Sequence, residues 1–426
     1  MRNWPVSSLK GKIHIKHGFP FKSDFFTDEE TDYIVLTPGN FYEEGGFKRQ
    51  IGKEKFYTGE IPDSYLHKEG DLIVAMTEQA AGLLGSCARV PESGIYLHNQ
   101  RLGLITTDPQ KILKEYVYHL FKTKTVREQI RLTSSGSKVK HTSPERIYDV
   151  RVPLPNVDEQ QRIVTLLDAI EEKIELNNSI NAELEAMAKT LYDYWFVQFD
   201  FPDANGKPYK TSGGKMVYNF TLKRKIPEGW SVKTLSQIAN ITMGQSPEGS
   251  SYNEEGIGTI FYQGSTDFGW LFPTNRQYTT APSRMAKKGD ILLSVRAPVG
   301  NMNIANTNCC IGRGLAALNS KSGSDGFLFY VMKYFKQIFD RRNAEGTTFG
   351  SITKNDLHSL TLAYPKSDLL KKYDDVVTNY NKMIFERSLE NQELTKLRDW
   401  LLPMLMNGQV TVKTPSDTNQ EEVRYG

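Results

Sequence analysis

The chain opens with Trp4-Pro-Val-Ser-Ser-Leu9 and returns to this pattern as Trp230-Ser-Val-Lys-Thr-Leu235. A second recurrence pairs Gly70-Asp71-Leu-Ile-Val-Ala-Met76 with Gly289-Asp290-Ile-Leu-Leu-Ser-Val295. Each copy then closes with Tyr148-Asp-Val-Arg-Val-Pro-Leu-Pro155 or its counterpart His358-Ser-Leu-Thr-Leu-Ala-Tyr-Pro365, and with a long helical pattern. Matches this far apart indicate two diverged copies of one unit rather than a short-period solenoid.

Composition limits the class of protein. With 426 residues and 38% hydrophobic content, the chain is long enough to bury two cores, with a boundary near residue 200. No apolar stretch approaches the roughly 20 residues that span a bilayer, and Met1-Arg-Asn-Trp-Pro5 lacks the apolar region of a signal peptide. We therefore expect a cytoplasmic protein without a membrane partner. Cys87, Cys309 and Cys310 form neither a disulfide framework nor a paired metal motif, so we expect them to be buried as small apolar residues.

Two long helices are predicted by residues that recur at alternating spacings of three and four, a pattern typical of coiled coils. Asp158 and Asp368 are their candidate N-caps. The predicted seam contains Ile163, Leu167, Ile170, Ile174, Asn177, Asn181, Leu184, Ala188, Leu191 and Trp195 in the first helix, and Tyr373, Val377, Tyr380, Ile384, Arg387, Asn391, Leu394, Arg398, Leu401 and Leu405 in the second.

Helices of about 40 residues with one apolar stripe need a partner, and the simplest partner for each is the other. Because each helix follows its own globular unit, an antiparallel coiled coil roughly 60 Å long is expected, with a unit at each end and an approximate internal twofold axis. The central polar residues Asn177, Asn181, Arg387 and Asn391 would then disfavour slipped registers. In the alternative, these residues face solvent and Leu176, Ile180 and Leu389 take over the seam.

The fold class expected is α+β, with two similar strand-rich domains joined by the antiparallel helices. Gly-Asp turns lead into predicted strands at 72–76 and 291–295, alternation predicts a strand at the end of each copy, and helical patterns cover 112–131 and 327–341. The predicted organisation is a first globular domain at 1–155, a central helix at 156–197, a linker at 198–229, a second globular domain at 230–365, a distal helix at 366–408 and a loose tail at 409–426.

Two features of the polar segments bear on function. Six basic residues and no acidic one lie between Gly206 and Ile226, which fits either a solvated linker or a phosphate-contacting strip. Before its last strand, each copy has a polar loop that contains glycine, at 134–143 and 345–354. Such loops can present backbone N–H groups and hydroxyls to phosphate oxygens, and ordinary surface loops have the same composition.

The duplicated unit with its long helix resembles the specificity subunit of type I restriction-modification systems, over residues 1 to 410. The most specific part is the segment from Trp195-Phe-Val-Gln-Phe-Asp-Phe-Pro-Asp203 through Gly213-Gly-Lys-Met-Val-Tyr218 to Ile226-Pro-Glu-Gly-Trp230. The resemblance implies two target-recognition domains that each read one half of a gapped target in double-stranded DNA. It further implies that the helices act as a ruler and dock two modification (methyltransferase) subunits, in a larger assembly with restriction subunits.

The candidate base-reading and phosphate-contacting residues are hydrogen-bonding side chains in polar loops, because Arg and Lys suit guanine while Asn and Gln suit adenine. Stacking on bases is a further option for the aromatic residues from Tyr252 to Tyr278, although packing explains most of them. The candidates are Asn40, Lys48, Arg49, Glu78, Gln79, Lys138, Lys140, His141 and Thr142 in the first copy, and Gln263, Ser265, Thr266, Asp267, Arg276, Arg296, Thr347, Thr348, Ser351 and Lys354 in the second.

Catalytic motifs are missing from the sequence. There is no Asn/Asp-Pro-Pro-Tyr/Phe motif of adenine methyltransferases, no phosphate-binding Gly-x-x-x-x-Gly-Lys-Ser/Thr loop and no His-Glu-x-x-His metal motif. We therefore expect a non-catalytic chain without a metal or cofactor, and assign S-adenosylmethionine, ATP and magnesium to partner subunits. These absences disfavour a restriction-methyltransferase fusion. A helical-hairpin scaffold whose globular ends bind protein or carbohydrate is the remaining alternative, and salt-dependent DNA binding would separate the two.

Overall fold

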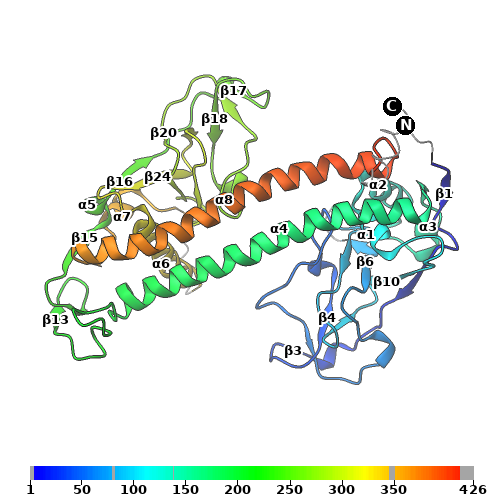
Figure 1. Cartoon of the computed structure of the whole chain (residues 1–426), viewed down its shortest axis with the longest axis horizontal. Coiled ribbons are helices and arrows are strands. Elements are labelled where there is room, and N and C mark those ends of the chain that lie inside the picture. The colour runs from blue at the N-terminus through cyan, green and yellow to red at the C-terminus, as the bar shows by residue number, and fades with distance from the viewer. Residues whose placement is uncertain (1–3, 79–81, 138, 345–350, 413–426) are drawn as a thin grey trace, which may run out of the picture. The chain divides into compact units, whose positions relative to one another are not determined.

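The computed structural model describes residues 4–78, 82–137, 139–344 and 351–412, with the backbone alone for 341–344. The chain divides into two compact units. Unit 1 contains Met1–Ile174 and Glu393–Gly426, and unit 2 contains Glu175–Gln392. The long helices α4 (Val157–Tyr192) and α8 (Ser367–Met406) therefore each contribute one part to each unit (Figure 1).

Unit 1 is built on two sheets. The first is antiparallel in the order β2-β10-β6-β8, and the second has the order β3-β5-β4-β9 with β4 and β9 parallel. Two short pairs, β1-β12 and β7-β11, complete the unit. The strands are β1 Val6–Ser8, β2 Ile13–His17, β3 Phe26–Thr27, β4 Ile34–Leu36, β5 Phe56–Tyr57, β6 Leu72–Ala75, β7 Thr77–Glu78, β8 Cys87–Arg89, β9 Tyr96–His98, β10 Leu102–Thr107, β11 Lys140–His141 and β12 Arg151–Pro153.

Strand β6 shows how the sheets meet. Its residues alternate between two cores, since Leu72 and Val74 pack with helix α1 while Ile73 and Ala75 pack with the second sheet. A strand buried on both faces requires the continuous apolar run seen in the sequence. The predicted helix at 112–131 is instead two helices, α1 (Lys114–Lys122) and α2 (Lys124–Leu132), because the Thr123 hydroxyl caps α2 by accepting the Val126 N–H. Helix α3 (Pro144–Tyr148) follows.

Unit 2 repeats this strand order. Its antiparallel sheet runs β16-β24-β21-β22, and its second sheet runs β17-β19-β18-β23-β20 with β18 and β23 parallel. The predicted duplication is therefore confirmed in the topology. The elements are β15 Ser231–Thr234, β16 Ala239–Met243, β17 Tyr252–Asn253, β18 Thr259–Tyr262, β19 Tyr278–Thr279, β20 Met285–Ala286, β21 Ile291–Ser294, β22 Met302–Ile304, β23 Cys309–Ile311, β24 Leu315–Ser320 and β25 Thr361–Tyr364, with helices α5 Leu235–Ile238, α6 Asp325–Ala344 and α7 Lys354–Ser359.

The long helices begin before their predicted N-caps, one residue after the predicted bounds at 156 and 366. Helix α4 follows Asn156, whose side-chain oxygen accepts the Glu159 N–H at 2.9 Å, and α8 begins at Ser367. Asp158 and Asp368 are therefore not N-caps but first-turn residues, where a carboxylate favours the positive end of the helix dipole.

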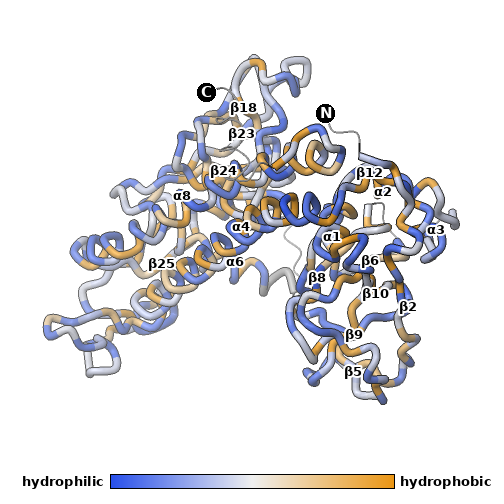
Figure 2. The backbone as a smooth tube through the Cα atoms, turned by 45° about the vertical axis from the view of Figure 1, so that its right-hand side comes forward, coloured by the Kyte–Doolittle hydropathy of each residue, from blue (hydrophilic) through white to orange (hydrophobic). Residues whose placement is uncertain are grey.

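Within each unit the two helices pair antiparallel. In unit 1, Ile163 and Leu167 share a core with Leu401 and Leu405. In unit 2, the Tyr373 hydroxyl donates to the Ala188 carbonyl at 3.2 Å, and Asn177 meets Asn391 further along. Hydrophobic and hydrophilic residues alternate along both helices (Figure 2). The α+β fold with a paired, antiparallel helical spacer is as predicted.

Most predicted seam residues lie inward. Asn177 and Asn181 are each only 1% exposed, whereas Leu176 is 55% exposed, so the alternative seam through Leu176, Ile180 and Leu389 is wrong. Arg387 is also a correction, because the adjacent Ser388 takes the buried position and meets Asn181. Buried members are Ile163, Leu167, Ile170, Asn181, Leu184, Tyr373, Val377 and Ile384, and half-buried members are Ile174, Leu191, Tyr380, Asn391, Leu394 and Leu401.

The segment 198–229 is folded as part of unit 2. It contains the hairpin β13 (Met216–Asn219) and β14 (Arg224–Pro227), anchored by the buried side chains of Phe199 and Ile226. The Arg224 guanidinium lies 4.6 Å from the centre of the Phe199 ring. At the end of the described chain, Val410 and Val412 pack on the unit 1 core. The first residues of the predicted tail, which starts at 409, are therefore packed rather than loose.

Two smaller observations complete the fold. Cys87, Cys309 and Cys310 are fully buried, as predicted. None of the helices in the described residues combines the length and apolar character that a membrane crossing requires.

Candidate nucleic-acid interface

A 3₁₀ turn follows the first of the two parallel strands in each copy. In unit 1, β4 leads into the 3₁₀ turn Pro38–Asn40, and in unit 2, β18 leads into Ser265–Asp267. The last residue of each turn is polar and buried, since Asn40 is 7% and Asp267 is 8% exposed. The structure thus places these two candidates at equivalent positions.

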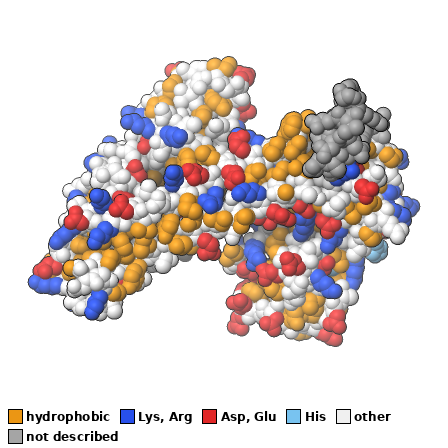
Figure 3. All heavy atoms as spheres, viewed as in Figure 1, with side chains coloured by type: hydrophobic (Ala, Val, Ile, Leu, Met, Phe, Trp, Pro, Cys, Tyr) orange, Lys and Arg blue, Asp and Glu red, His pale blue; other side chains and the backbone are white. Residues whose placement is uncertain are grey.

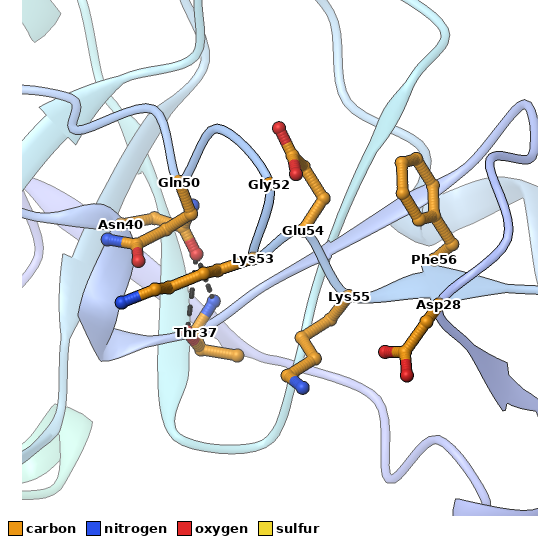
Figure 4. Close-up of a pocket in the computed structure, with 9 residues that line it drawn as sticks. All are labelled: Asp28, Thr37, Asn40, Gln50, Gly52, Lys53, Glu54, Lys55 and Phe56. Carbon is orange, nitrogen blue, oxygen red and sulfur yellow. Dashed lines mark hydrogen bonds between the residues drawn. The ribbon is translucent and has the colours of Figure 1, made fainter. Parts of the chain in front are cut away.

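The Asn40 side chain organises its own loop. Its Oδ1 accepts the Thr37 N–H at 2.9 Å (Figure 4). Its Nδ2 donates to the Lys48 carbonyl at 3.4 Å. Because its amide is engaged on both sides, Asn40 in this conformation positions neighbouring side chains rather than offering a free reading edge.

A cavity of about 590 Å³ lies beside Asn40 (Figure 4). Sequence reasoning missed three of its hydrogen-bonding residues, Gln50, Lys53 and Lys55. The sequence feature that could have identified this segment is the pair of lysines, Lys53 and Lys55, just before strand β5 and close to the candidates Lys48 and Arg49. The lining residues are Asp28, Thr37, Asn40, Gln50, Gly52, Lys53, Glu54, Lys55 and Phe56.

The loops that contain glycine also occupy equivalent places. In unit 1, the Thr142 N–H donates to the Met76 carbonyl at 3.0 Å, and in unit 2, the Ile352 N–H donates to the Val295 carbonyl at 2.8 Å. Each loop is therefore held at the end of the central strand of its sheet. Lys140 and His141 pair with Glu78 and Thr77 as strands β11 and β7, and Ser351 bridges to Arg296. Gln79, Lys138, Thr347 and Thr348 lie outside the described residues.

The candidates in the first loop differ in their exposure. Glu78 is buried and its carboxylate accepts the N–H groups of Gly82, at 3.0 Å, and Leu84, at 2.8 Å, so it holds the backbone of its own loop. His141 is exposed, and its Nδ1 lies 3.1 Å from the Thr77 hydroxyl. Thr142 is buried, while Lys140 is half-buried. Of these residues, His141 and Lys140 are the ones that face outward.

Four candidates of the second copy line one hollow of about 470 Å³. Gln263, Ser265 and Thr266 come from the turn after β18, and Arg296 comes from the end of β21. Residues about 30 positions apart in sequence thus form one polar surface, with the exposed Ser351 bridged to Arg296. Lys354, at the start of α7, is also exposed.

Asp267 and Arg276 form an ion pair beside this hollow. The Arg276 Nε donates to Asp267 Oδ1 at 2.8 Å, and its Nη2 donates to Asp267 Oδ2 at 3.3 Å. The Arg276 Nη1 lies 3.4 Å from Glu254 Oε1. The hydrogen bond to Asp267 raises the pKa of Arg276 above its usual value. The Arg276 side chain is still 51% exposed.

Two cations of the first copy lie on the same loop. Arg49 pairs with Glu92, and this hydrogen bond raises its pKa. The Lys48 ammonium lies 5.8 Å from the Tyr42 ring centre. Acidic side chains gather on the part of unit 1 that carries β3 (Figure 3), between Asp24 and Asp32, and Asp28 also lines the cavity beside Asn40. A concentration of carboxylates disfavours contact with phosphate.

Most aromatic residues near the second site belong to the core. Phe261, Tyr262 and Phe272 are at most 3% exposed, whereas Trp270 is 53% exposed. Packing therefore accounts for the first three, in agreement with the simpler of the two interpretations.

The duplication also appears in the comparison with known proteins, because one family model matches two segments of the chain. The family model described as type I restriction modification DNA specificity domain matches residues 1–186 and 227–395. The type I restriction enzyme MjaIX specificity subunit of Methanocaldococcus jannaschii is 27% identical, over 71% of this chain and 70% of the relative. Another chain of that organism is 28% identical, over 97% of this chain and 95% of the relative.

A solved structure shares the fold. The S subunit of a type I restriction-modification system from M. genitalium has a TM-score of 0.59 and 17% identity, with 95% of this chain and 96% of that chain covered.

Proposed function

Because the chain belongs to the type I restriction modification DNA specificity family, we propose that each of its two copies reads one half of a gapped target in double-stranded DNA. The chain is a DNA target-recognition subunit of such a system. The observation that carries the two-part target is the duplication itself: each copy has the same strand order, the same polar turn after its parallel strand and the same held loop. Two readers in one chain suit a target in two parts.

The two copies present different side chains on this shared frame. The first presents Lys48, Lys140 and His141, with Asn40 ordering the Lys48 loop. The second carries Gln263, Ser265, Thr266, Arg276, Arg296, Ser351 and Lys354. Side chains that differ at equivalent places favour two different half-sites, because base identity is read by the donors and acceptors that reach the groove.

The helices are proposed to set the gap between the half-sites. Helix α4 has 36 residues, and at 1.5 Å per residue it is about 54 Å long. Half-sites one turn apart on one face of DNA are separated by about 34 to 36 Å, so a helix of this length suits a gapped target.

Chemistry is assigned to partner subunits. Two modification subunits would supply adenine methylation with S-adenosylmethionine, and restriction subunits would supply ATP- and magnesium-dependent cleavage. This chain would act without a catalytic residue, metal or cofactor of its own, which the missing methyltransferase and nucleotide-binding motifs support.

The test is a map of methylated adenines in a genome that expresses this chain with its modification subunits. The expected result is one asymmetric motif in two parts with a fixed gap. A continuous motif would contradict the two-reader proposal. Binding of the assembled complex to duplex DNA should also weaken steeply with salt. Salt-independent binding to a protein or sugar would favour the scaffold alternative.

A further inference from the structure

The ion pair in unit 2 occupies one side of the Arg276 guanidinium. Asp267 engages Arg276 from the side, through Nε and one hydrogen of Nη2. A guanidinium has five N–H donors in a rigid fork, so the outer hydrogens of Nη1 and Nη2 can donate in parallel once the long contact between Nη1 and Glu254 gives way. That outer pair matches the O6 and N7 acceptors of guanine in the major groove.

Asp267 is built to hold this orientation. Its side chain is only 8% exposed, and it ends the turn whose other residues, Ser265 and Thr266, line the neighbouring hollow. The Asp267 backbone carbonyl also accepts the Thr274 N–H at 2.8 Å, which ties the turn to the segment that carries Arg276. The ion pair and this backbone hydrogen bond therefore fix the Arg276 segment against the turn before any ligand binds.

The charges around Arg276 disfavour a phosphate as its ligand. Asp267 and Glu254 both contact the guanidinium, so the cluster of three side chains is net negative. A phosphate would be repelled by the two carboxylates, whereas a guanine edge is neutral. Glu254 is 67% exposed and its contact is long, at 3.4 Å, so its carboxylate can give way to a base.

The first copy lacks this pair. Phe56 pairs with Ile34 as Tyr278 pairs with Ile260, which places Glu54 at the position of Arg276. Asn40 occupies the position of Asp267. The Asp267–Arg276 pair therefore has no counterpart at the equivalent positions of the first copy.

We propose that Arg276 reads a guanine in the half-site of the second copy and that Asp267 is its positioning residue. This inference rests on the proposed function and names one base of its target. It also changes the role of Asp267 from a reader to a support.

The experiment uses the full chain with its modification subunits and duplexes in which the second half-site is randomised. Wild type, Arg276→Ala, Arg276→Lys and Asp267→Asn are compared, with Arg284→Ala as a control, since Arg284 is another exposed arginine of unit 2. Arg276→Ala should lose preference for guanine at one position by about tenfold or more while other positions keep theirs. Asp267→Asn should weaken the same position only, and Arg276→Lys should retain part of the preference.

A second measurement does not depend on the folding of a variant. Wild type is tested on a duplex with 7-deazaguanine, which lacks the N7 acceptor, at each guanine of the second half-site in turn. One substitution should weaken binding several-fold for wild type and leave Arg276→Ala unaffected.

Two results would overturn the assignment alone: Arg276→Ala keeps every base preference, or it weakens all sequences equally with a shallower salt dependence, as a phosphate contact would. Absence of any base preference by wild type in this half-site would overturn the proposed function as well.

Discussion

The Asn177 side-chain amide on α4 donates a hydrogen bond to Asn391 Oδ1 on α8 across 2.9 Å. Asn391 in turn donates to Asn178 Oδ1 at 2.8 Å, and Asn181 donates to the Ser388 hydroxyl at 3.3 Å. In an otherwise apolar seam, these contacts form in one register only, because a shift by one turn would bury each amide against an apolar side chain.

Asn177→Ala should therefore destabilise unit 2 by about 1 to 3 kcal/mol, since it removes hydrogen bonds from a buried position. Urea unfolding of the full chain measures the change. The control is Leu176→Ala at the preceding residue, whose side chain is 55% exposed. This substitution should alter the free energy of unfolding by less than about 0.5 kcal/mol. Equal effects of the two substitutions would show that the amide contacts do not stabilise the pair.

A half-buried acidic side chain joins α4 to the core of unit 1. Asp168 accepts hydrogen bonds from His119 Nε2 at 2.7 Å and Arg89 Nη2 at 2.9 Å, and the His119 side chain is 1% exposed. Asp168→Ala should cost about 2 to 4 kcal/mol in the free energy of unfolding, because it leaves buried donors without an acceptor. Asp108→Ala, which removes an exposed carboxylate near Lys111, should have little effect. Similar melting temperatures for wild type and Asp168→Ala would contradict this role.

A histidine pair makes unit 1 sensitive to acid. His67 Nε2 lies 2.9 Å from His98 Nδ1, and burial followed by the nearby His67 lowers the pKa of His98 to about 3. An unfolded histidine titrates near 6.5, so the unfolded state binds more protons between these two values. The stability contributed by neutral His98 is thus complete above about pH 6.5 and is lost as the pH falls toward about 3, for a total of a few kcal/mol.

Urea unfolding between pH 7 and 4 tests this prediction. Wild type should lose stability on acidification more steeply than His98→Gln. His14→Gln, at an exposed histidine, is the control and should keep the wild-type slope. Parallel slopes for wild type and His98→Gln would show that His98 is not the titrating group.

Substitution of Lys48 distinguishes a phosphate contact from a base contact. It is exposed on the loop that Asn40 orders, and we expect it to contact phosphate. Lys48→Ala should weaken binding to all duplexes alike and reduce the slope of log affinity against log salt by about 0.9. Binding titrations at several salt concentrations provide the measurement. A change of preference at one base would instead make Lys48 a reader.

The sequence predicted the elements that rest on local patterns. The two-fold repetition, the strands at 72–76 and 291–295 and the long helices follow from apolar periodicity and glycine turns, and the structure contains all of them. The polar seam was left open between two registers, because periodicity alone does not tell whether Asn177 or Leu176 lies inward. Burial and the partner helix decide that question.

The candidate site was predicted less completely, for a physical reason. Sequence distinguishes polar loops from apolar strands, so it found the turns and loops that lie at equivalent places. It does not give side-chain direction, which is why Glu78 and Asn40 were candidates although both bond to their own loops. The pairing of Asp267 with Arg276 depends on how two segments meet in space.

The central claim is that the helices set the gap between two independent readers. The most direct measurement inserts one heptad after Ile174 and one after Gln392, where the units divide, and maps methylated adenines with the modification subunits present. Seven residues add about 10.5 Å, or about three base pairs, and keep the seam in phase. We predict that both half-sites stay unchanged while the gap lengthens by about three base pairs. An unchanged gap, or altered half-sites, would contradict the account.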